Sequence, residues 1–262
     1  MLDLHCHVLP GVDDGAIDLR DALALADDAV EQGCRAICAT SHLWENLFDT
    51  SAALLEREYD EYVKAVRREG IPLEVFPGAE NFLGKMAPEE FAEKSVPLGP
   101  GRKYVLFDFS LRAVPDHVGD TVVALLAAGR VPLIAHPERN LELQADPSRV
   151  AEWIAQGARI QVNAPSLLGL LGRAAQDSAE HLLESGAAHV LASDAHDRKR
   201  RPFCLAAARD RVAQVYGEEE ATRLTHDRPW QIARGETFDV PNVTIEPRSG
   251  PRRLLRRLFD RL

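Results

Sequence analysis

The sequence lacks the features of a membrane-spanning or secreted protein. Its 262 residues contain no long apolar run, whereas a transmembrane helix needs about 20 such residues. No basic segment followed by an apolar stretch opens the chain, so no signal peptide is expected. Cys6, Cys34, Cys38 and Cys204 are scattered without CxxC spacing, which favours reduced thiols over a disulfide framework. We therefore expect a soluble, cytoplasmic protein.

The chain has fewer basic than acidic residues: 31 Lys and Arg against 41 Asp and Glu, for a net charge of −10. Nucleic-acid binding needs a basic face, so a nucleic-acid partner is not expected. The exception is residues 248–262, where arginines alternate with Leu and Phe at helical spacing. This segment predicts a basic amphipathic tail. It would contact an anionic membrane surface or an acidic partner, or simply pack on the domain.

Several motifs for nucleophilic or nucleotide chemistry are also missing. A cysteine-dependent phosphatase needs an Arg six positions after its Cys, but those positions hold Val12, Thr40, Trp44 and Asp210. The glycine-rich loops GxxxxGK[ST] and GxGxxG and the GxSxG elbow are absent as well. These absences exclude four common mechanisms and leave room for a metal-dependent one.

What the sequence does contain is a regular alternation of short apolar runs and helix-forming stretches, as expected for βαβ units around a parallel sheet. The helical stretches begin near Asp18, Thr50, Asp116 and Asp146 and end at glycines. Seven such units predict one α/β domain, either a closed or nearly closed barrel or an open doubly wound sheet. The seven predicted strands are Leu2–His5, Ala36–Thr40, Leu73–Pro77, Tyr104–Phe109, Val131–Ala135, Arg159–Asn163 and His189–Ala192.

Metal-binding residue types lie at the C-terminal ends of these predicted strands, where parallel α/β folds bind ligands. Histidine and carboxylate together suit Mn, Fe and Zn. Alternation along an extended segment points His5 and His7 the same way and turns Cys6 into the wall. The predicted strand-end ligands are His5, His7, His42, Glu80, Asp108, His136, Asp194 and His196. The remaining histidines, His117, His181, His189 and His226, are given structural roles.

Arginines lie beside these predicted ligands and could hold an anionic substrate. Arg139 follows His136 closely, and residues 198–201 follow His196. A guanidinium binds phosphate oxygens in a bidentate fashion. We therefore expect Arg139, above all, to contact a phosphate.

The motifs resemble those of the PHP (polymerase and histidinol phosphatase) superfamily, and within it the CpsB/YwqE type of bacterial metal-dependent protein-tyrosine phosphatase. The resemblance runs almost end to end, and its most specific segments are HCHVLPGVDDG at residues 5–15 and AHPER at residues 135–139. Further matching segments are Ala39-Thr40-Ser41-His42, Gly78-Ala79-Glu80, Gln161-Val162-Asn163 and Ala192-Ser193-Asp194-Ala195-His196.

This resemblance implies a distorted (βα)7 TIM-like barrel, the PHP fold, over residues 1–247, followed by the basic tail. It also implies three divalent metal ions, commonly manganese, with iron or zinc as alternatives. The implied ligands of the first ion are His5, His7, Glu80 and Asp194, and those of the second are the bridging Glu80, Asp108 and His136. Asp14, His42 and His196 would hold the third ion, with Arg139 and Arg201 as phosphate contacts.

The implied function is hydrolysis of phosphotyrosine on the tail of a bacterial tyrosine autokinase that controls capsule or exopolysaccharide synthesis. Two alternatives remain open: a PHP-type phosphatase for a small molecule such as histidinol phosphate, and a non-enzymatic regulatory module with a vestigial metal site. The vestigial module predicts missing ligands, yet all nine positions carry competent types. Two departures stand out: Asp108 replaces a longer Glu, and Leu43-Trp44-Glu45-Asn46 is less basic than in related proteins.

Overall fold

The computed structural model describes residues 1–246, and within them nine strands pair only in parallel. One sheet has the order β1-β2-β4 and the other the order β3-β5-β6-β7-β8-β9. The strands are β1 (Leu2–Cys6), β2 (Ala36–Ala39), β3 (His42–Leu43), β4 (Glu74–Pro77), β5 (Glu80–Phe82), β6 (Tyr104–Asp108), β7 (Val131–Ala135), β8 (Arg159–Asn163) and β9 (Val190–Ala192).

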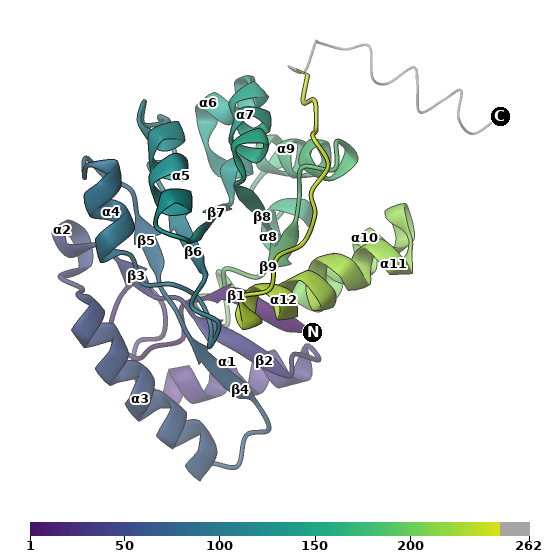
Figure 1. Ribbon diagram of the computed structural model, residues 1–262. Coiled ribbons are helices and arrows are strands. Elements are labelled where there is room, and N and C mark those ends of the chain that lie inside the picture. The colour runs from purple at the N-terminus through teal and green to yellow at the C-terminus, as the bar shows by residue number, and fades with distance from the viewer. Residues whose placement is uncertain (247–262) are drawn as a thin grey trace.

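Helices surround these strands as an outer ring (Figure 1). Within residues 1–246, none of them combines the length and the apolar character that crossing a bilayer requires. The helices are α1 (Leu19–Glu31), α2 (Glu45–Phe48), α3 (Ala52–Arg68), α4 (Pro88–Lys94), α5 (Val118–Ala127), η1 (Pro137–Arg139), α6 (Leu141–Ala145), α7 (Ser148–Gln156), α8 (Ala164–Leu167), α9 (Arg173–Glu184), α10 (Leu205–Tyr216), α11 (Glu218–Thr222), η2 (Arg223–Asp227) and α12 (Arg228–Arg234).

The two ends of the strand series meet. The backbone N–H of Asp194, just after β9, donates to the carbonyl of His5 in β1 at 2.8 Å, and the N–H of His7 donates to Ala195 at 2.8 Å. These bonds make the first and last strands neighbours. The barrel interpretation is therefore confirmed, and the open doubly wound sheet is wrong.

The barrel is distorted where two of its strands are interrupted. The expected second and third strands form as β2 and β4, and each is followed by a further short strand, β3 or β5, that belongs to the other sheet. Residues Leu98 and Gly99 fill the resulting gap, because Leu98 N–H donates to Tyr104 in β6 and Gly99 N–H donates to Pro77 in β4. The sequence pattern missed β3 and β5 because each is only two or three residues long.

Helix ends follow their predicted caps in part. Asp18 caps α1 by accepting from the N–H of Asp21 at 2.9 Å, as expected. The prediction that Thr50 starts α3 is wrong. Ser51 is the cap, because the Thr50 hydroxyl accepts a bond from the N–H of Trp44 at 2.8 Å instead.

Two apolar cores hold the barrel together. Leu4, Tyr104, Leu106 and Leu133 pack inside it with Ile232 of α12, while a larger core lies between the strands and the surrounding helices. The interior core leaves the C-terminal ends of the strands free for polar side chains. The predicted basic tail, residues 248–262, lies outside the described residues.

Candidate metal centre

A shift in strand register brings His5 and His7 to the mouth of the barrel. The pairing of β1 with β2 is irregular between Asp3 and Cys6, so Leu4 packs in the interior core and the following His5 also faces inward. Such an extra residue re-aims the side chains that follow it. Cys6 then points outward, where its Sγ contacts the carbonyl of Cys38 at 3.1 Å. Cys6 is therefore part of the wall, as predicted.

The outer nitrogens of these two rings are held by fixed acceptors. Nδ1 of His5 lies 3.0 Å from Oε1 of Gln161, and Nδ1 of His7 lies 2.8 Å from Oδ2 of Asp13. Because both partners are acceptor oxygens, each Nδ1 donates to its partner, and Nε2 is the atom that each ring presents to a ligand. The two Nε2 atoms face each other at 3.2 Å, an arrangement that a cation between them would stabilise.

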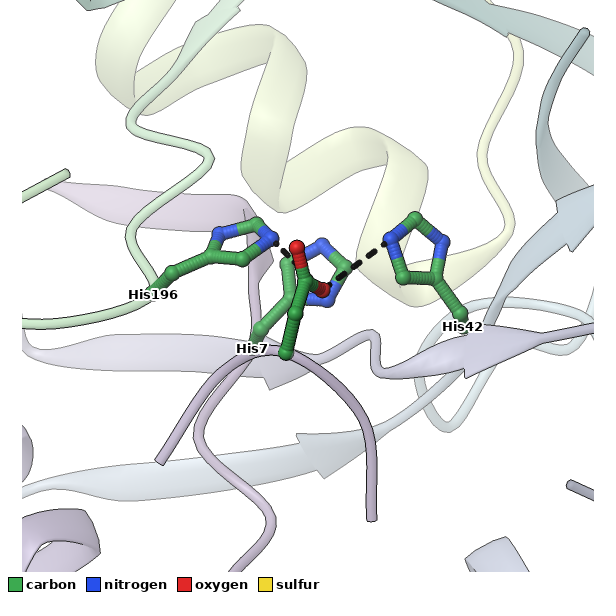
Figure 2. A group of neighbouring side chains, drawn as sticks. His7, His42 and His196 are labelled. Atoms are coloured by element: carbon green, nitrogen blue, oxygen red, sulfur yellow. Dashed lines mark ion pairs between the residues drawn. The ribbon is translucent and has the colours of Figure 1, made fainter. Parts of the chain in front are cut away.

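A tight loop presents Asp14 to two further histidines. A side chain at Gly15 would lie 2.2 Å from the carbonyl of His7, so only glycine permits the loop to approach β1 so closely. Oδ1 of Asp14 lies 3.4 Å from Nε2 of His42 and 3.3 Å from Nε2 of His196. Figure 2 shows the rings of His7, His42 and His196 around this carboxylate. Burial opposes ionisation, but both histidines hold the pKa of Asp14 below its usual range.

Glu80 occupies the middle of the cluster. Its Oε2 lies 3.3 Å from Nε2 of His5 and 2.9 Å from Nδ1 of His42, while its Oε1 lies 2.9 Å from Nε2 of His136. Although burial raises the pKa of Glu80, the charges of His5 and His42 lower it well below its usual value. An ionised carboxylate that faces several imidazole nitrogens is a suitable ligand for a divalent metal ion.

Asp108 and His136 complete the neighbouring group. Ligand atoms of Glu80, Asp108 and His136 all lie within 4.8 Å of one another. Burial and the charge of Glu80 raise the pKa of Asp108 well above its usual value, whereas burial lowers the pKa of His136 to about 4. A neutral imidazole is the form that binds metal, and a divalent cation would favour the ionised form of Asp108.

Asp194 divides its carboxylate between two functions. Oδ1 lies 3.5 Å from Nε2 of both His5 and His7, while Oδ2 accepts from Arg139 at 2.8 Å, Arg201 at 2.6 Å and Asn163 at 2.6 Å. Although burial raises the pKa of Asp194, the charges of His5 and Arg201 lower it well below its usual value. Oδ1 therefore faces the histidines as an anionic oxygen.

The donor set fits metal ions. Within residues 1–246, Oδ1 of Asp108 and Oδ1 of Asp194 are buried without a hydrogen-bond donor, and buried oxygens of this kind are costly unless something satisfies them. His136 and Asp194 also adopt positive φ angles of 33° and 52°. Non-glycine residues rarely do so, and such strain is concentrated at functional sites.

All nine predicted ligands come together, and their roles remain predictions. Their ligand atoms form three overlapping groups, with Asp194 beside the first. The groups are His5-His7-Glu80, Glu80-Asp108-His136 and His7-Asp14-His42-His196. Of the basic run 198–201, Arg201 alone reaches the cluster, because Arg198 pairs with Asp28 at 2.7 Å while Lys199 and Arg200 are exposed.

Sequence reasoning missed three supporting residues: Asp13, Gln161 and Asn163. Asp13 orients His7 and also accepts the N–H of His42 at 2.8 Å. Gln161 donates to Asn163 at 2.7 Å, which joins the partner of His5 to the partner of Asp194. The signal was visible as two polar residues at alternate positions of the buried strand β8.

A cavity of about 250 Å³ opens over the cluster. Its lining includes the predicted ligands Asp14, His42, Glu80, Asp108 and His136, together with Arg139 and Arg201. The aromatic side chains of Trp44, Phe48, Phe82 and Phe109 also line it. Phe48 stacks on the ring of His42 with centroids 5.0 Å apart. The cavity thus combines cations, ligand groups and aromatic surface.

The sequence matches the family model described as capsular polysaccharide synthesis, CpsB/CapC, over residues 1–234. A relative named tyrosine-protein phosphatase YwqE, from Bacillus subtilis (strain 168), is 32% identical over 248 residues, covering 95% of this chain and 98% of its own. A relative named tyrosine-protein phosphatase CpsB, from Streptococcus pneumoniae, is 30% identical, covering 88% of this chain and 98% of its own.

Comparison with solved structures also finds similarity to tyrosine phosphatases of this type. One that is described as YwqE from Bacillus subtilis and CpsB from Streptococcus pneumoniae, unique metal-dependent tyrosine phosphatases, matches with a TM-score of 0.88 and 31% identity. The match covers 95% of this chain and 100% of that one. A variant organophosphorus hydrolase matches with a TM-score of 0.54 at 15% identity, a level that shows a common fold and nothing about activity.

Proposed function

Because the chain belongs to the capsular polysaccharide synthesis CpsB/CapC family, we propose that it is a metal-dependent phosphatase that hydrolyses phosphotyrosine. The observation that carries this proposal is the convergence of nine ligand-type side chains and two arginines beneath one cavity. The names of the relatives, all tyrosine-protein phosphatases, favour it over a small-molecule phosphatase or a vestigial site.

We assign three divalent ions, manganese in the active enzyme, to the three groups of ligands. His5, His7, Glu80 and Asp194 would hold the first ion, and Glu80, Asp108 and His136 would hold the second. Asp14, His42 and His196 would hold the third. The overlap of the groups at Glu80 supports a shared, bridging carboxylate.

When bound, these ions would activate a water molecule for attack on phosphorus and offset the charge of the phosphoryl oxygens. Arg139 and Arg201 bind the phosphate through their guanidinium groups, and their common partner Asp194 holds both at the edge of the cavity. The side chains of His5 and His7 keep their ring orientation through Gln161 and Asp13.

The leaving group of phosphotyrosine hydrolysis needs little help from a proton donor. A tyrosine phenol has a pKa of about 10, so its anion leaves without the strong protonation that an aliphatic alcohol requires. We assign no general acid. Trp44, Phe48 and Phe109, which line the cavity, would instead surround the phenyl ring and exclude water from it.

We further propose that the physiological substrate is the phosphorylated tail of a bacterial tyrosine kinase acting in capsule or exopolysaccharide synthesis, within the cytoplasm. The family description supports the capsule role. The four cysteines are all buried and free, in keeping with a reducing compartment. The basic segment 248–262 would add contact with a membrane surface or an acidic partner.

The direct test is release of phosphate from phosphotyrosine peptides by the full chain with added Mn²⁺, measured beside phosphoserine peptides and histidinol phosphate. We expect the phosphotyrosine peptides to be preferred, and chelation to abolish turnover until metal is restored. Activity that persists after complete chelation would contradict the metal mechanism. Preference for histidinol phosphate would favour the small-molecule alternative.

A further inference from the structure

A second cavity, of about 600 Å³, lies beside the one over the metal ligands. Trp44 and Phe82 line both cavities. Their rings stack with centroids 3.6 Å apart and an interplanar angle of 10°. The two cavities are therefore neighbours across a shared aromatic wall.

The buried polar side chains that line the second cavity, Asn81 and Ser95, already have partners. The Asn81 amide donates to the carbonyl of Leu106 at 2.8 Å and accepts from the N–H of Val96 at 2.8 Å. The hydroxyl of Ser95 donates to the carbonyl of Phe91. What these groups leave available to a ligand is mainly carbon surface.

That carbon surface comes from several elements. Leu43 lies in β3, Met86 precedes α4, and Phe91 lies within α4. Charged groups occur as well: Lys94 and Glu90 pair with each other at 2.7 Å, and Lys85 is exposed to solvent. A cavity of this kind suits an apolar side chain of a ligand better than an anionic one, since burying an unpaired charge is costly.

We propose that this cavity is a second substrate subsite, which binds an apolar or aromatic side chain located within two positions of the phosphotyrosine. The inference rests on the proposed function, which places the phosphotyrosine in the first cavity. Extended peptides advance about 3.3 Å per residue, so a chain whose phosphotyrosine lies on one side of the Trp44–Phe82 wall can place a nearby residue on the other side.

The first experiment compares phosphotyrosine peptides that differ at single positions from two before to two after the phosphotyrosine. Each position is occupied in turn by Leu, Phe, Ala or Asp, and p-nitrophenyl phosphate serves as a substrate without any neighbouring residue. We expect kcat/KM to rise about 10-fold from Ala to Leu or Phe at one position, the factor that burial of an apolar side chain worth about 1.4 kcal/mol supplies.

The second experiment fills the cavity. Ala52, an exposed residue at the start of α3, lines it, whereas the next residue, Ala53, is equally exposed and does not. In Ala52→Trp we expect the Leu-to-Ala ratio of kcat/KM to fall to about one. Ala53→Trp, which adds the same side chain one residue further on, should keep the 10-fold ratio.

A binding measurement separates recognition from catalysis. Calorimetry with non-hydrolysable phosphonate peptides should give the same Ala-to-Leu gain in affinity for the wild type and Ala53→Trp, and no gain for Ala52→Trp. Equal kcat/KM for all peptides, a preference for Asp, or an unchanged ratio in Ala52→Trp would each overturn the subsite. If the wild type with added Mn²⁺ hydrolysed neither p-nitrophenyl phosphate nor any of the peptides, the proposed function would be overturned instead.

Discussion

Nη1 of Arg139 lies 2.8 Å from Oδ2 of Asp194, the residue whose other oxygen faces the histidines of the metal centre. One carboxylate thereby joins the predicted metal ligands to the predicted phosphate contacts. The arginine sits at the edge of the cavity rather than among the ligands, since its side chain keeps a 19% exposed fraction against 1% for Asp194. Metal binding and substrate binding should therefore be separable by mutation.

Replacing Arg139 should remove turnover and leave the metal. We expect Arg139→Ala to lower kcat about 100-fold to 1,000-fold, the range found when one donor to a developing charge is removed. Metal content per chain, measured by elemental analysis, should remain that of the wild type. Arg200→Ala is the matched control, because Arg200 is exposed and does not line the cavity. Wild-type turnover in Arg139→Ala would remove this residue from the mechanism.

Replacing His136 should remove metal and turnover together. His136 adopts a φ of 33°, a region that asparagine tolerates well, so His136→Asn removes the imidazole while keeping the backbone. We expect metal content to fall by about one ion per chain, and activity to fall at least about 100-fold. His181→Asn, on α9 and outside the three ligand groups, serves as the control. Full metal content in His136→Asn would contradict its assignment as a ligand.

Asp13 tests the supporting layer of the site. Its carboxylate binds Nδ1 of His7 and the N–H of His42, and His7 in turn holds the pKa of Asp13 down at about 2. Burial alone would raise that pKa. We expect Asp13→Ala to weaken metal binding about 10-fold to 100-fold, as measured by calorimetric titration of the metal-free protein. Asp13→Asn keeps an acceptor oxygen and should lose less. Equal losses in the two variants would point to the charge of Asp13, not its hydrogen bond.

Most of the barrel could be predicted from periodicity because each strand carries its own apolar signal. The ligands were visible for a related reason: polar residues directly after buried strands are rare unless they have a function. His5 and Asp194 are 189 positions apart, yet a barrel makes their strands neighbours, and the N–H of Asp194 bonds to His5. The order of the strands in a barrel therefore predicts that these two residues lie close together.

What the sequence left open depends on details that periodicity does not encode. The register shift in β1 turns both Leu4 and His5 inward, against strict alternation. Thr50 and Ser51 are both competent caps, and the choice between them follows from the contact of Thr50 with Trp44. The second cavity requires Trp44 and Phe82 to stack, which involves two strand ends 38 positions apart and has no local signature.

His189 offers a test of stability that is independent of the metal centre. It is fully buried, and its Nδ1 accepts the N–H of Ile160 at 2.8 Å, so the ring is held in the neutral form. Burial, followed by the charges of Arg228 and Arg159, lowers the pKa of His189 well below 6.5. In the unfolded chain the same ring would titrate near 6.5.

Acidification should therefore destabilise the fold through His189. Below about pH 6.5 the unfolded state binds a proton that the folded state does not, so the free energy of unfolding falls by up to about 1.4 kcal/mol per pH unit. His189→Asn keeps an acceptor for Ile160 and removes the titration. It should be less stable than the wild type at pH 7.5, and the difference should shrink on acidification. Urea denaturation of both metal-free proteins between pH 5 and 7.5 measures this. A constant difference would show that His189 titrates alike in both states.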